Sequence, residues 1–380
     1  MQIIDLLVWV LLSCSILYAI STLLILIGLH LPISRVTNAS QPFISVVIAA
    51  RNEADYIGEC LEGVTNQTYP KNRYEVIAVD DNSDDDTAEI ISQYESEHSN
   101  VTGLAVANDY PEMAAKKRPM SVGILAAQGE IILTTDADCQ VPGRWIEGFA
   151  KHFEEDVGTV IGFSQTKTPG ARLGYFERLQ GLDFLTLMAA SAGSTKLGIP
   201  LAATGQNLAY RKSLFDSVGG FSSIADRPSG DDVLLLQLLS KQDCRTLFAE
   251  DPDTFVSTWR TESPLEFWQQ RRRWASNAFA QLKLNPAFFA YTLVVFLVNL
   301  LLLLTLVLGI YRETSGIPFA CWVLKAMGDL LVISKGTRLF NRRDLISAFP
   351  IWEFVQPPYI VFVALTSLFT GFTWKSRRHC

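Results

Sequence analysis

Two carboxylates one residue apart, Asp136 and Asp138, follow an apolar run that ends in Thr134-Thr135. At the end of a buried strand, such a pair can offer oxygen ligands to a hard cation, Mg²⁺ or Mn²⁺, that also binds a diphosphate. Burying both charges without a cation would be costly. The competing interpretation is a solvated loop, in which paired acids are common. We favour a site for a divalent cation and a diphosphate.

Polar residues also follow the first two expected strands. The first strand leads into Arg51-Asn52-Glu53 and the second into Asp80-Asp81-Asn82. Because ligands of a parallel sheet bind where the carboxyl ends of neighbouring strands meet, we expect these loops to lie side by side. A carboxylate there, Asp81 in particular, can accept hydrogen bonds from a base or a ribose. Asp84 to Asp86 are instead expected to cap the next helix, since acids favour helix N-termini.

A basic cluster, Lys116-Lys117-Arg118, precedes an expected helix at 119–127. Either the cluster is solvated, or one of its side chains neutralises a phosphate. A second acidic pair, Asp231-Asp232, runs into an apolar helical stretch at 233–239. One of these acids can cap that helix. The other, placed beside a reacting hydroxyl, could act as a general base for attack on an activated carbon.

An arginine-rich segment at 269–274 ends about a dozen residues before an uncharged stretch that starts at Pro286. At a membrane edge, such a cluster is by default an anionic-lipid or topogenic patch. Alternatively, Arg273 binds a diphosphate bidentately while Trp274 stacks on a sugar or lipid group. The sequence has only four histidines, so we expect its chemistry to depend on carboxylates.

The elements that must position these residues alternate along the chain. β-Branched runs predict strands at 44–50, 74–79, 101–106 and 130–135, and helical patterns lie at 54–64, 85–94 and 119–127. Strands that alternate with helices of this length indicate βαβ units and a mostly parallel sheet. The expected fold class is therefore α/β, with the ligand at the carboxyl ends of the strands.

The composition indicates a membrane protein. Apolar residues make up 49% of the 380 residues and charged residues only 19%, against roughly 25% charged in an average soluble domain. The segments 6–29, 286–310 and 354–374 carry no charge, and each reaches the roughly 20 residues that span a bilayer as a helix. A fourth segment, 317–334, is ambiguous because it contains Lys325 and Asp329. Disorder, a disulfide scaffold and a purely soluble protein are excluded.

These segments predict three parts: a transmembrane anchor at 1–30, a catalytic domain at 40–283, and a membrane region at 284–380 with two or three transmembrane helices. The first segment lacks a basic flank and a small-residue cleavage site, so we expect it to be retained. Residues 31–285 contain 23 basic and 34 acidic side chains. A domain this acidic is a poor candidate for nucleic-acid binding.

The basic residues of the C-terminal region suggest an orientation. Placing the catalytic domain in the cytoplasm puts four of them, between 335 and 343, on the inside, provided that the segment 317–334 crosses the membrane, and this agrees with the positive-inside rule. The same count puts Lys375, Arg377 and Arg378 outside, which the rule disfavours. Either the segment 317–334 lies at the interface, or the last segment, interrupted by Pro357-Pro358, is re-entrant. The number of spans, three or four, stays open, and we expect a multi-pass protein of the cell (inner) membrane.

Taken in order, the motifs resemble those of the family 2 glycosyltransferases of GT-A fold. The pattern is most similar to membrane-anchored, synthase-like members, which share a Q-R-x-R-W motif before their transmembrane helices. The resemblance covers about residues 43–280 and rests on five motifs. These are the segments 45–53, 79–83, 136–138, 230–232 and 270–274.

The resemblance implies roles on the donor side of the site. The nucleoside would be held by Arg51, Glu53 and Asp81. Lys116 would lie near the diphosphate and Asp136 would contact the nucleotide. Asp138 would bind the divalent cation, Mg²⁺ or Mn²⁺.

The resemblance also implies roles on the acceptor side. Asp232 matches the acid that family members use as the base. The acceptor and diphosphate region would be lined by Asp231, Gln270, Arg273 and Trp274. The base motif reads Gly-Asp-Asp here, where many members have Glu-Asp, so the choice of Asp232 over Asp231 follows from the alignment of the motif.

The expected activity is inverting transfer of a hexose or N-acetylhexosamine from a nucleotide-sugar, most often a UDP-sugar. The acceptor would be a lipid-linked molecule or a glycan at the cytoplasmic face of the membrane. Two alternatives remain. One is a processive polysaccharide synthase, for which three or four spans are few. The other is a catalytically idle GT-A domain that serves as an assembly partner.

Overall fold

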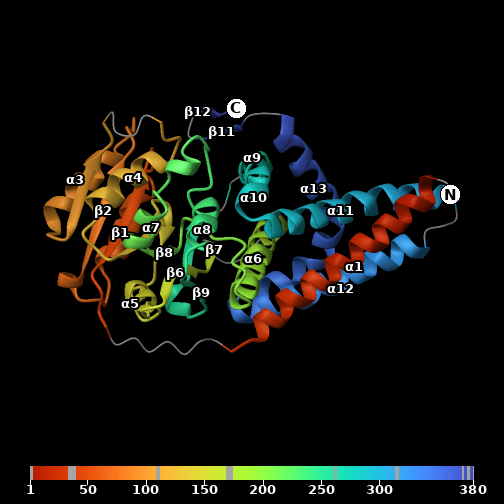
Figure 1. Ribbon diagram of the computed structural model, residues 1–380. Coiled ribbons are helices and arrows are strands. Elements are labelled where there is room, and N and C mark those ends of the chain that lie inside the picture. Colours follow the sequence, from red (N-terminus) through yellow and green to blue (C-terminus); the bar gives the residue numbers. More distant parts are fainter. Residues whose placement is uncertain are drawn as a thin grey trace.

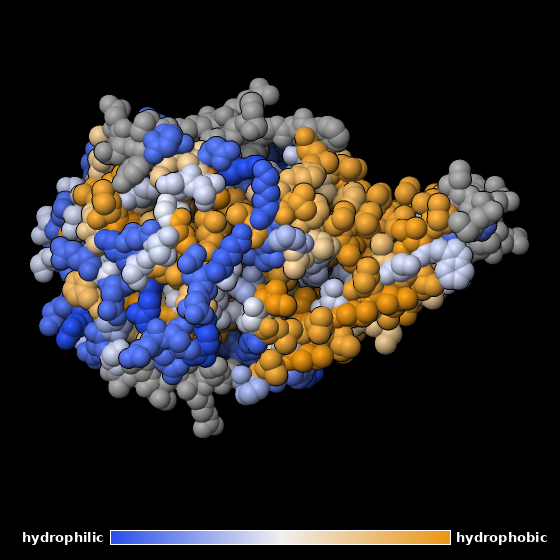
Figure 2. Space-filling model, viewed as in Figure 1, coloured by the Kyte–Doolittle hydropathy of each residue, from blue (hydrophilic) through white to orange (hydrophobic). Residues whose placement is uncertain are grey.

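The computed structural model describes residues 3–32, 40–107, 112–167, 174–259, 261, 263–312, 316–369, 372–374 and 377–379. An α/β part lies beside a bundle of long helices that projects from it (Figure 1). On the face shown in Figure 2, the α/β part is largely hydrophilic and the bundle is hydrophobic. The apolar excess of the composition is therefore concentrated in the bundle.

A seven-stranded sheet, in the order β3-β2-β1-β4-β8-β6-β9, forms the centre of the α/β part. Its strands are β1 (Ile44–Ala50), β2 (Tyr74–Asp80), β3 (Val101–Ala105), β4 (Ile131–Asp136), β6 (Val157–Gly162), β8 (Leu208–Arg211) and β9 (Arg245–Ala249). β8 runs antiparallel to both of its neighbours, and the other strands share one direction. The expected mostly parallel sheet is confirmed, and the four expected strands coincide with β1 to β4 to within one residue at each end.

Helices cover both faces of this sheet, because side chains alternate between the faces along each strand. Val46 and Ile48 of β1 belong to a hydrophobic cluster with α2 (Ile57–Thr65), α3 (Thr87–Glu97) and α5 (Trp145–Ala150). Val47 belongs to the opposite cluster, with α4 (Lys117–Ala126), α6 (Tyr175–Lys196) and α8 (Val233–Leu239). α8 coincides with the expected helix, whereas α6 is an element that the sequence patterns did not predict. A short helix, α7 (Lys212–Ser217), follows β8.

A second, three-stranded sheet has the order β5-β10-β7. Its strands are β5 (Cys139–Gln140), β7 (Ser164–Lys167) and β10 (Val256–Trp259). β5 begins directly after the turn that follows β4, so Asp138 lies between the two sheets. Thr258 of β10 donates a hydrogen bond from Oγ1 to Oδ2 of Asp138 at 3.2 Å. The small sheet therefore helps to hold the second carboxylate of the Asp136/Asp138 pair.

Four helices of the described chain are long and apolar enough to cross a membrane. They are α1 (Ile3–His30), α11 (Pro286–Arg312), α12 (Gly316–Leu339) and α13 (Phe349–Phe369). α13 continues through Pro357 and Pro358, so the interruption expected there is wrong; neighbouring helices can compensate for the hydrogen bonds that proline removes. Residues 370–371 of the expected last segment, and Lys375, lie outside the described residues. A two-stranded hairpin, β11 (Phe372–Trp374) and β12 (Arg377–His379), follows α13.

Lys325 and Asp329, which made the third segment ambiguous, are buried inside the bundle. Nζ of Lys325 lies 2.7 Å from Oδ2 of Asp329 and 2.8 Å from Oε1 of Glu353 on α13. Tyr18 of α1 donates a hydrogen bond to Asp329. Ionisable residues are tolerated in a membrane helix when they face the bundle interior and one another. The charges therefore do not prevent α12 from crossing, and they connect three of the helices.

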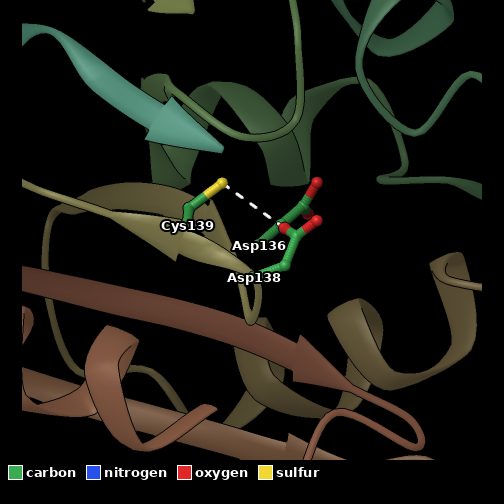
Figure 3. A group of neighbouring side chains, drawn as sticks. All are labelled: Asp136, Asp138 and Cys139. Atoms are coloured by element: carbon green, nitrogen blue, oxygen red, sulfur yellow. Dashed lines mark hydrogen bonds between the residues drawn. The ribbon is translucent and has the colours of Figure 1, made fainter. Parts of the chain in front are cut away.

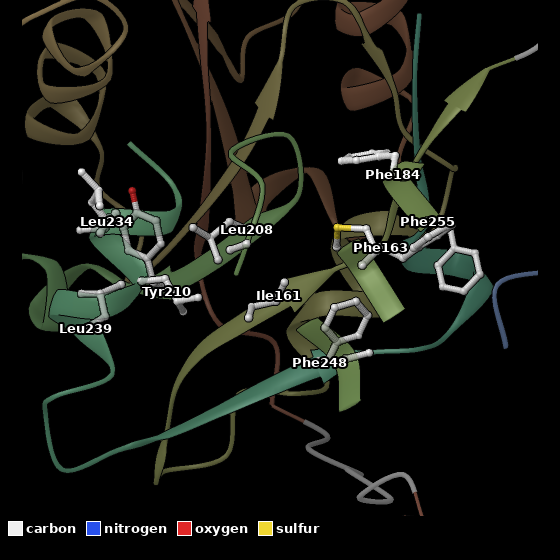
Figure 4. Close-up of a cluster of buried hydrophobic side chains, with 14 of the residues drawn as sticks. Ile161, Phe163, Phe184, Leu208, Tyr210, Leu234, Leu239, Phe248 and Phe255 are labelled. Carbon is white, nitrogen blue, oxygen red and sulfur yellow. The ribbon is translucent and has the colours of Figure 1, made fainter. Parts of the chain in front are cut away.

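The sheet and the helix bundle share one hydrophobic core. Ile25 and Leu29 of α1 and Ile333 of α12 belong to the same cluster as Val47 of β1. Phe163, which follows β6, stacks on Phe340, which follows α12, with ring centroids 3.9 Å apart. Figure 4 shows Phe163 among other side chains of this cluster. The α/β part is thus packed directly onto the four long apolar helices.

α6 meets α1 at two glycines. A Cβ at Gly28 would lie 1.9 Å from the carbonyl oxygen of Gly193, and a Cβ at Gly193 would lie 2.4 Å from that of Ile25. We expect Gly193→Leu to lower the free energy of unfolding by about 1–3 kcal/mol, as overpacking does, and to lower the melting temperature in detergent. Gly58→Ala in α2 is the control, because a Cβ there meets nothing within 4 Å. An unchanged melting temperature of the Gly193→Leu protein would contradict the close contact.

Candidate active site

A cleft of about 700 Å³ opens at the carboxyl ends of β1, β2 and β4. Ligands of parallel sheets bind at this edge. The cleft is lined by every residue to which the family resemblance assigns a role: Arg51, Glu53, Asp81, Lys116, Asp136, Asp138, Asp231, Asp232, Gln270, Arg273 and Trp274. The fold therefore brings these separate segments of the chain together around one space.

Lys116 joins the two acidic pairs of the cleft. Its ammonium forms an ion pair with Asp136 and lies 3.5 Å from Oδ2 of Asp231. Burial lowers the pKa of Lys116, but the two carboxylates outweigh burial and raise the pKa well above its usual range. Lys116 is therefore a fixed positive charge between the acids that follow β4 and those that precede α8.

The basic cluster is not solvated, so that interpretation of it is wrong. Lys117 is only 1% exposed, and its ammonium donates hydrogen bonds to the backbone oxygens of Arg227 and Ser229. Arg118 forms an ion pair with Asp81. Successive residues at the start of α4 point in directions about 100° apart, which is why adjacent cations reach different partners. Lys117 supports the loop that leads to Asp231 and Asp232, and Arg118 holds the carboxylate after β2.

The loops after β1 and β2 lie side by side, as expected. The backbone N–H of Asp84 donates to Oδ1 of Asn52 at 2.8 Å. Arg51 donates to the backbone oxygen of Asp81. Of the acids expected to cap α3, Asp85 accepts a hydrogen bond from a backbone N–H in the first turn of that helix at 3.1 Å. Joined by these hydrogen bonds, the two loops form one wall of the cleft.

Asp136, Asp138 and Cys139 offer ligand atoms that all lie within 4.8 Å of one another (Figure 3). The two carboxylates are hard oxygen donors that suit Mg²⁺ or Mn²⁺. Burial raises the pKa of the Cys139 thiol well above its ordinary value, so Cys139 stays a neutral thiol, which hard cations do not prefer. The thiol donates to Oδ1 of Asp138 at 3.5 Å. These residues fit a divalent cation held by the two carboxylates.

Asp232 is fixed in place at the start of α8. Its Oδ1 accepts a hydrogen bond from the backbone N–H of Val233 at 2.6 Å, and its Oδ2 accepts one from the backbone N–H of Gly205 at 3.1 Å. Gly230, with φ of 89°, makes the turn before the acidic pair, in a conformation that glycine adopts without strain. Asp232 is thus both the helix cap and a side chain of the cleft wall.

The two acids before α8 differ in pKa. Burial, followed by the negative charge of Asp231, raises the pKa of Asp232 to about 6. Burial acts in the same direction on Asp231, but the positive charges of Lys116, Lys117 and Arg273 outweigh it and lower the pKa of Asp231. Neighbouring acids whose pKa values are separated in this way are typical of acid–base sites. Asp231 stays ionised, and Asp232 can exchange a proton near neutral pH.

α9 (Pro264–Ala275) carries the arginine-rich segment along the cleft. Gln270, Arg273 and Trp274 line the cleft. Arg271 is buried instead, with its Nε 2.6 Å from Oδ2 of Asp183 on α6, and its guanidinium lies 4.1 Å from the centre of the Trp274 ring. The segment is therefore a wall of the cleft packed on α6 and not a uniform surface patch. α10 (Ala278–Leu284) leads from α9 to α11.

Several cleft residues were not predicted from the sequence. Tyr56 and Trp259 line the cleft with ring centroids 5.6 Å apart. Others come from α6 and α11, including Phe184 and Phe288. No motif marks these residues, because a lone apolar or aromatic side chain in the sequence is as consistent with an ordinary core position.

Comparisons with known proteins point to glycosyltransferases. Residues 45–219 match the family described as Glycosyl transferase family 2. Glycosyltransferase AglE of Haloferax volcanii is 40% identical over 106 residues, which cover 28% of this chain and 34% of that protein. A Beta-monoglucosyldiacylglycerol synthase of Trichormus variabilis is 27% identical over 241 residues, which cover 63% and 50% of the two chains. The chain thus spans half or less of the length of these relatives.

Among solved structures, the mannosyltransferase PcManGT from Pyrobaculum calidifontis, in complex with GDP-Man and Mn²⁺, resembles the whole chain. The TM-score is 0.63 at 18% sequence identity, with 97% of this chain and 99% of that chain covered. At this identity the likeness concerns the fold, including the helices beside the α/β part. The expected α/β fold class is confirmed, and residues 45–219 match the model of the glycosyl transferase family 2.

Proposed function

We propose that this protein is an inverting glycosyltransferase that moves a sugar from a nucleotide-sugar, in the first instance a UDP-sugar, to a hydroxyl of a lipid-linked or glycan acceptor. The observation that carries the proposal is one cleft in which Lys116 connects Asp136 with Asp231, next to Asp232. One end of the cleft, at Asp136 and Asp138, suits a cation and a diphosphate, and the same cleft contains Asp232, a carboxylate that can act as a base. We place it at the cytoplasmic face of the cell membrane, with residues 40–283 as the catalytic domain.

On the donor side, we assign the nucleoside to Arg51, Glu53 and Asp81. The diphosphate would lie near Lys116 and Arg273, and Asp136 with Asp138 would hold Mg²⁺ or Mn²⁺. When bound, the cation offsets the negative charge that develops on the leaving diphosphate. The mannosyltransferase of similar fold was solved with GDP-Man and Mn²⁺, which supports a nucleotide-sugar with a divalent cation and makes GDP-sugars necessary members of any donor screen.

On the acceptor side, Asp232 takes the proton of the acceptor hydroxyl while its oxygen forms a bond to the anomeric carbon. The bond from that carbon to the diphosphate breaks, and the nucleoside diphosphate leaves with the electron pair. Attack from the face opposite the leaving group inverts the configuration. The ionised Asp231 keeps Lys116 in place between the two halves of the site.

A donor screen tests the proposal directly. Purified full-length protein is mixed with UDP- and GDP-sugars in the presence of Mn²⁺ or Mg²⁺, and the melting temperature is measured, since a ligand of the folded state raises it. A rise with at least one nucleotide-sugar, followed by its turnover in native lipid, is the expected result. Binding without turnover in native lipid favours the idle partner domain. A ladder of long products favours the processive synthase over single transfer, which we prefer because few spans are available for a channel.

The pH profile is a further test. We expect kcat/KM to fall about tenfold per pH unit below pH 6, because the base must be ionised and the pKa of Asp232 is about 6. Above that pH the profile should flatten. Initial rates with a saturating donor, from about pH 5 to pH 8, span the transition expected for this carboxylate. A profile that is flat through this range would contradict the assignment of Asp232.

A further inference from the structure

The cleft does not end at the carboxylates. It continues along α6, α10 and α11, where the α/β part meets the helix bundle. We call this portion the membrane half. Its described lining on α6, α10 and α11 includes Phe184, Leu187, Met188, Ala278, Phe288 and Thr292. These side chains are uncharged, whereas the opposite half contains the acids and cations described above. The cleft is therefore amphiphilic along its length.

The membrane half reaches into a helix that can span the bilayer. α11 begins at Pro286, so Thr292 lies less than two turns inside it, about 9 Å along the axis at 1.5 Å per residue. On the facing helix, Leu187 of α6 is 44% exposed although it lines the cleft. An acceptor with an apolar tail could therefore occupy the space between α6 and α11 while its polar end reaches Asp232.

A buried amide in this half lacks a partner. Gln281 of α10 lines the cleft and is only 2% exposed, yet its Oε1 has no hydrogen-bond partner among the described residues. Leaving a buried acceptor unsatisfied costs about 1–3 kcal/mol. A ligand hydroxyl could donate to this oxygen, whereas the oxygens of an ionised phosphate could not. The unpaired Oε1 of Gln281 therefore favours a lipid whose headgroup has a hydroxyl that can donate a hydrogen bond.

The charges at the junction of the two halves favour the same class of ligand. Asp231 and Asp232 line the cleft together, and Lys116 is already paired with Asp136 and Asp231. A phosphate nucleophile is an anion before it reacts and has no need of a base such as Asp232. An alcohol is neutral and requires a base. The junction therefore suits an alcohol better than a phosphate.

We propose that the acceptor is a membrane glycerolipid with an uncharged headgroup, free or already glycosylated, whose hydroxyl reacts at Asp232 while its acyl chains lie between α6 and α11. The proposal rests on the transferase activity proposed above. It adds the class of the acceptor, the route by which the acceptor enters from the bilayer, and Gln281 as a residue that binds its headgroup.

The decisive experiment offers three acceptors to the full-length protein in phosphatidylcholine vesicles, with a donor identified by the melting-temperature screen. These are a mixture of diacylglycerol and monoglycosyl diacylglycerol, a polyprenyl phosphate, and a soluble oligosaccharide. Labelled sugar in a neutral glycerolipid is the expected result. Label in polyprenyl phosphate or in the oligosaccharide alone would overturn the proposal. If no donor binds, the transferase activity itself fails, which is a different outcome from donor binding with the wrong acceptor.

Variants separate acceptor binding from folding. We expect Gln281→Leu to raise the KM for the lipid about tenfold, equivalent to about 1.4 kcal/mol, with the donor KM unchanged. Because an unsatisfied acceptor is removed, the melting temperature of this variant without lipid should be equal to or above that of the original protein. Thr292→Trp should also raise the lipid KM at least tenfold by filling the membrane half. Val307→Trp, at a residue of α11 that is 56% exposed and outside the cleft, is the control. An unchanged lipid KM in both cleft variants would refute the site.

Discussion

Asp232→Asn is expected to lower kcat by about 10²- to 10⁴-fold, the range that a positioned general base contributes. The amide cannot accept the proton of the acceptor hydroxyl. It can still accept one of the two backbone hydrogen bonds that Asp232 receives from Gly205 and Val233, so the loop before α8 should keep its conformation. The measurement is single-turnover transfer with saturating donor and acceptor.

The control for this variant is Asp226→Asn, which changes an exposed carboxylate in the same loop and should leave kcat unchanged. Donor binding is measured in parallel by the rise in melting temperature. Normal donor binding with a full turnover rate would refute Asp232 as the base and would turn attention to Asp231. If donor binding were lost as well, Asp232→Glu would be used to distinguish a misplaced loop from a missing base.

Asp138→Asn is expected to have the second large effect. Removing one of the two carboxylates that fit the cation should lower turnover by about 10²- to 10³-fold, because a catalytic metal supplies several kcal/mol of charge stabilisation. The concentration of Mn²⁺ needed for half-maximal donor hydrolysis should rise in the same variant. The fold should be retained, since the amide can still accept from the Thr258 hydroxyl.

Asp86→Asn is the matched control, because it alters an exposed acid of the neighbouring strand-end loop without touching the Asp136/Asp138 pair. Its Mn²⁺ dependence should equal that of the original protein. An Asp138→Asn protein with an unaltered Mn²⁺ requirement would show that the cation is held elsewhere in the cleft.

The parallel half of the sheet was predictable because its strands contain β-branched residues and three of them, β1, β2 and β4, are almost wholly buried. β1 reads Ile-Ser-Val-Val-Ile-Ala-Ala, and it is followed by a helix of ordinary amphipathic pattern, α2. α6 escaped prediction for a physical reason. It is covered by the sheet on one side and by α1 and α12 on another, so its buried residues include polar ones such as Gln180 and Asp183, and no single apolar stripe marks it.

The residues of the cleft at the strand ends were predictable, but the ion pairs and hydrogen bonds among its charged side chains were not. The positions of Asp81, Asp136 and Asp138 follow from their place after strands, and the structure puts all of them in one cleft. That Lys117 points into the protein while Lys116 points to the acids depends on the rotation of α4. Three identical charges in a row carry no signal of that rotation. The chemical roles of these residues stay predictions until the variants are tested.

The stacking of Phe163 on Phe340 has a consequence for how the protein is made. The ribosome synthesises the strands of the seven-stranded sheet before α12 and Phe340. Part of the apolar surface of the new sheet therefore stays uncovered until the C-terminal helices have been made. A soluble fragment cut at the expected boundaries, 40–283, would keep that surface permanently uncovered together with the α6 face that contacts Gly28 and Ile25. We therefore expect the fragment to aggregate on expression, and the two chain ends to be as necessary for folding the catalytic part as for anchoring it.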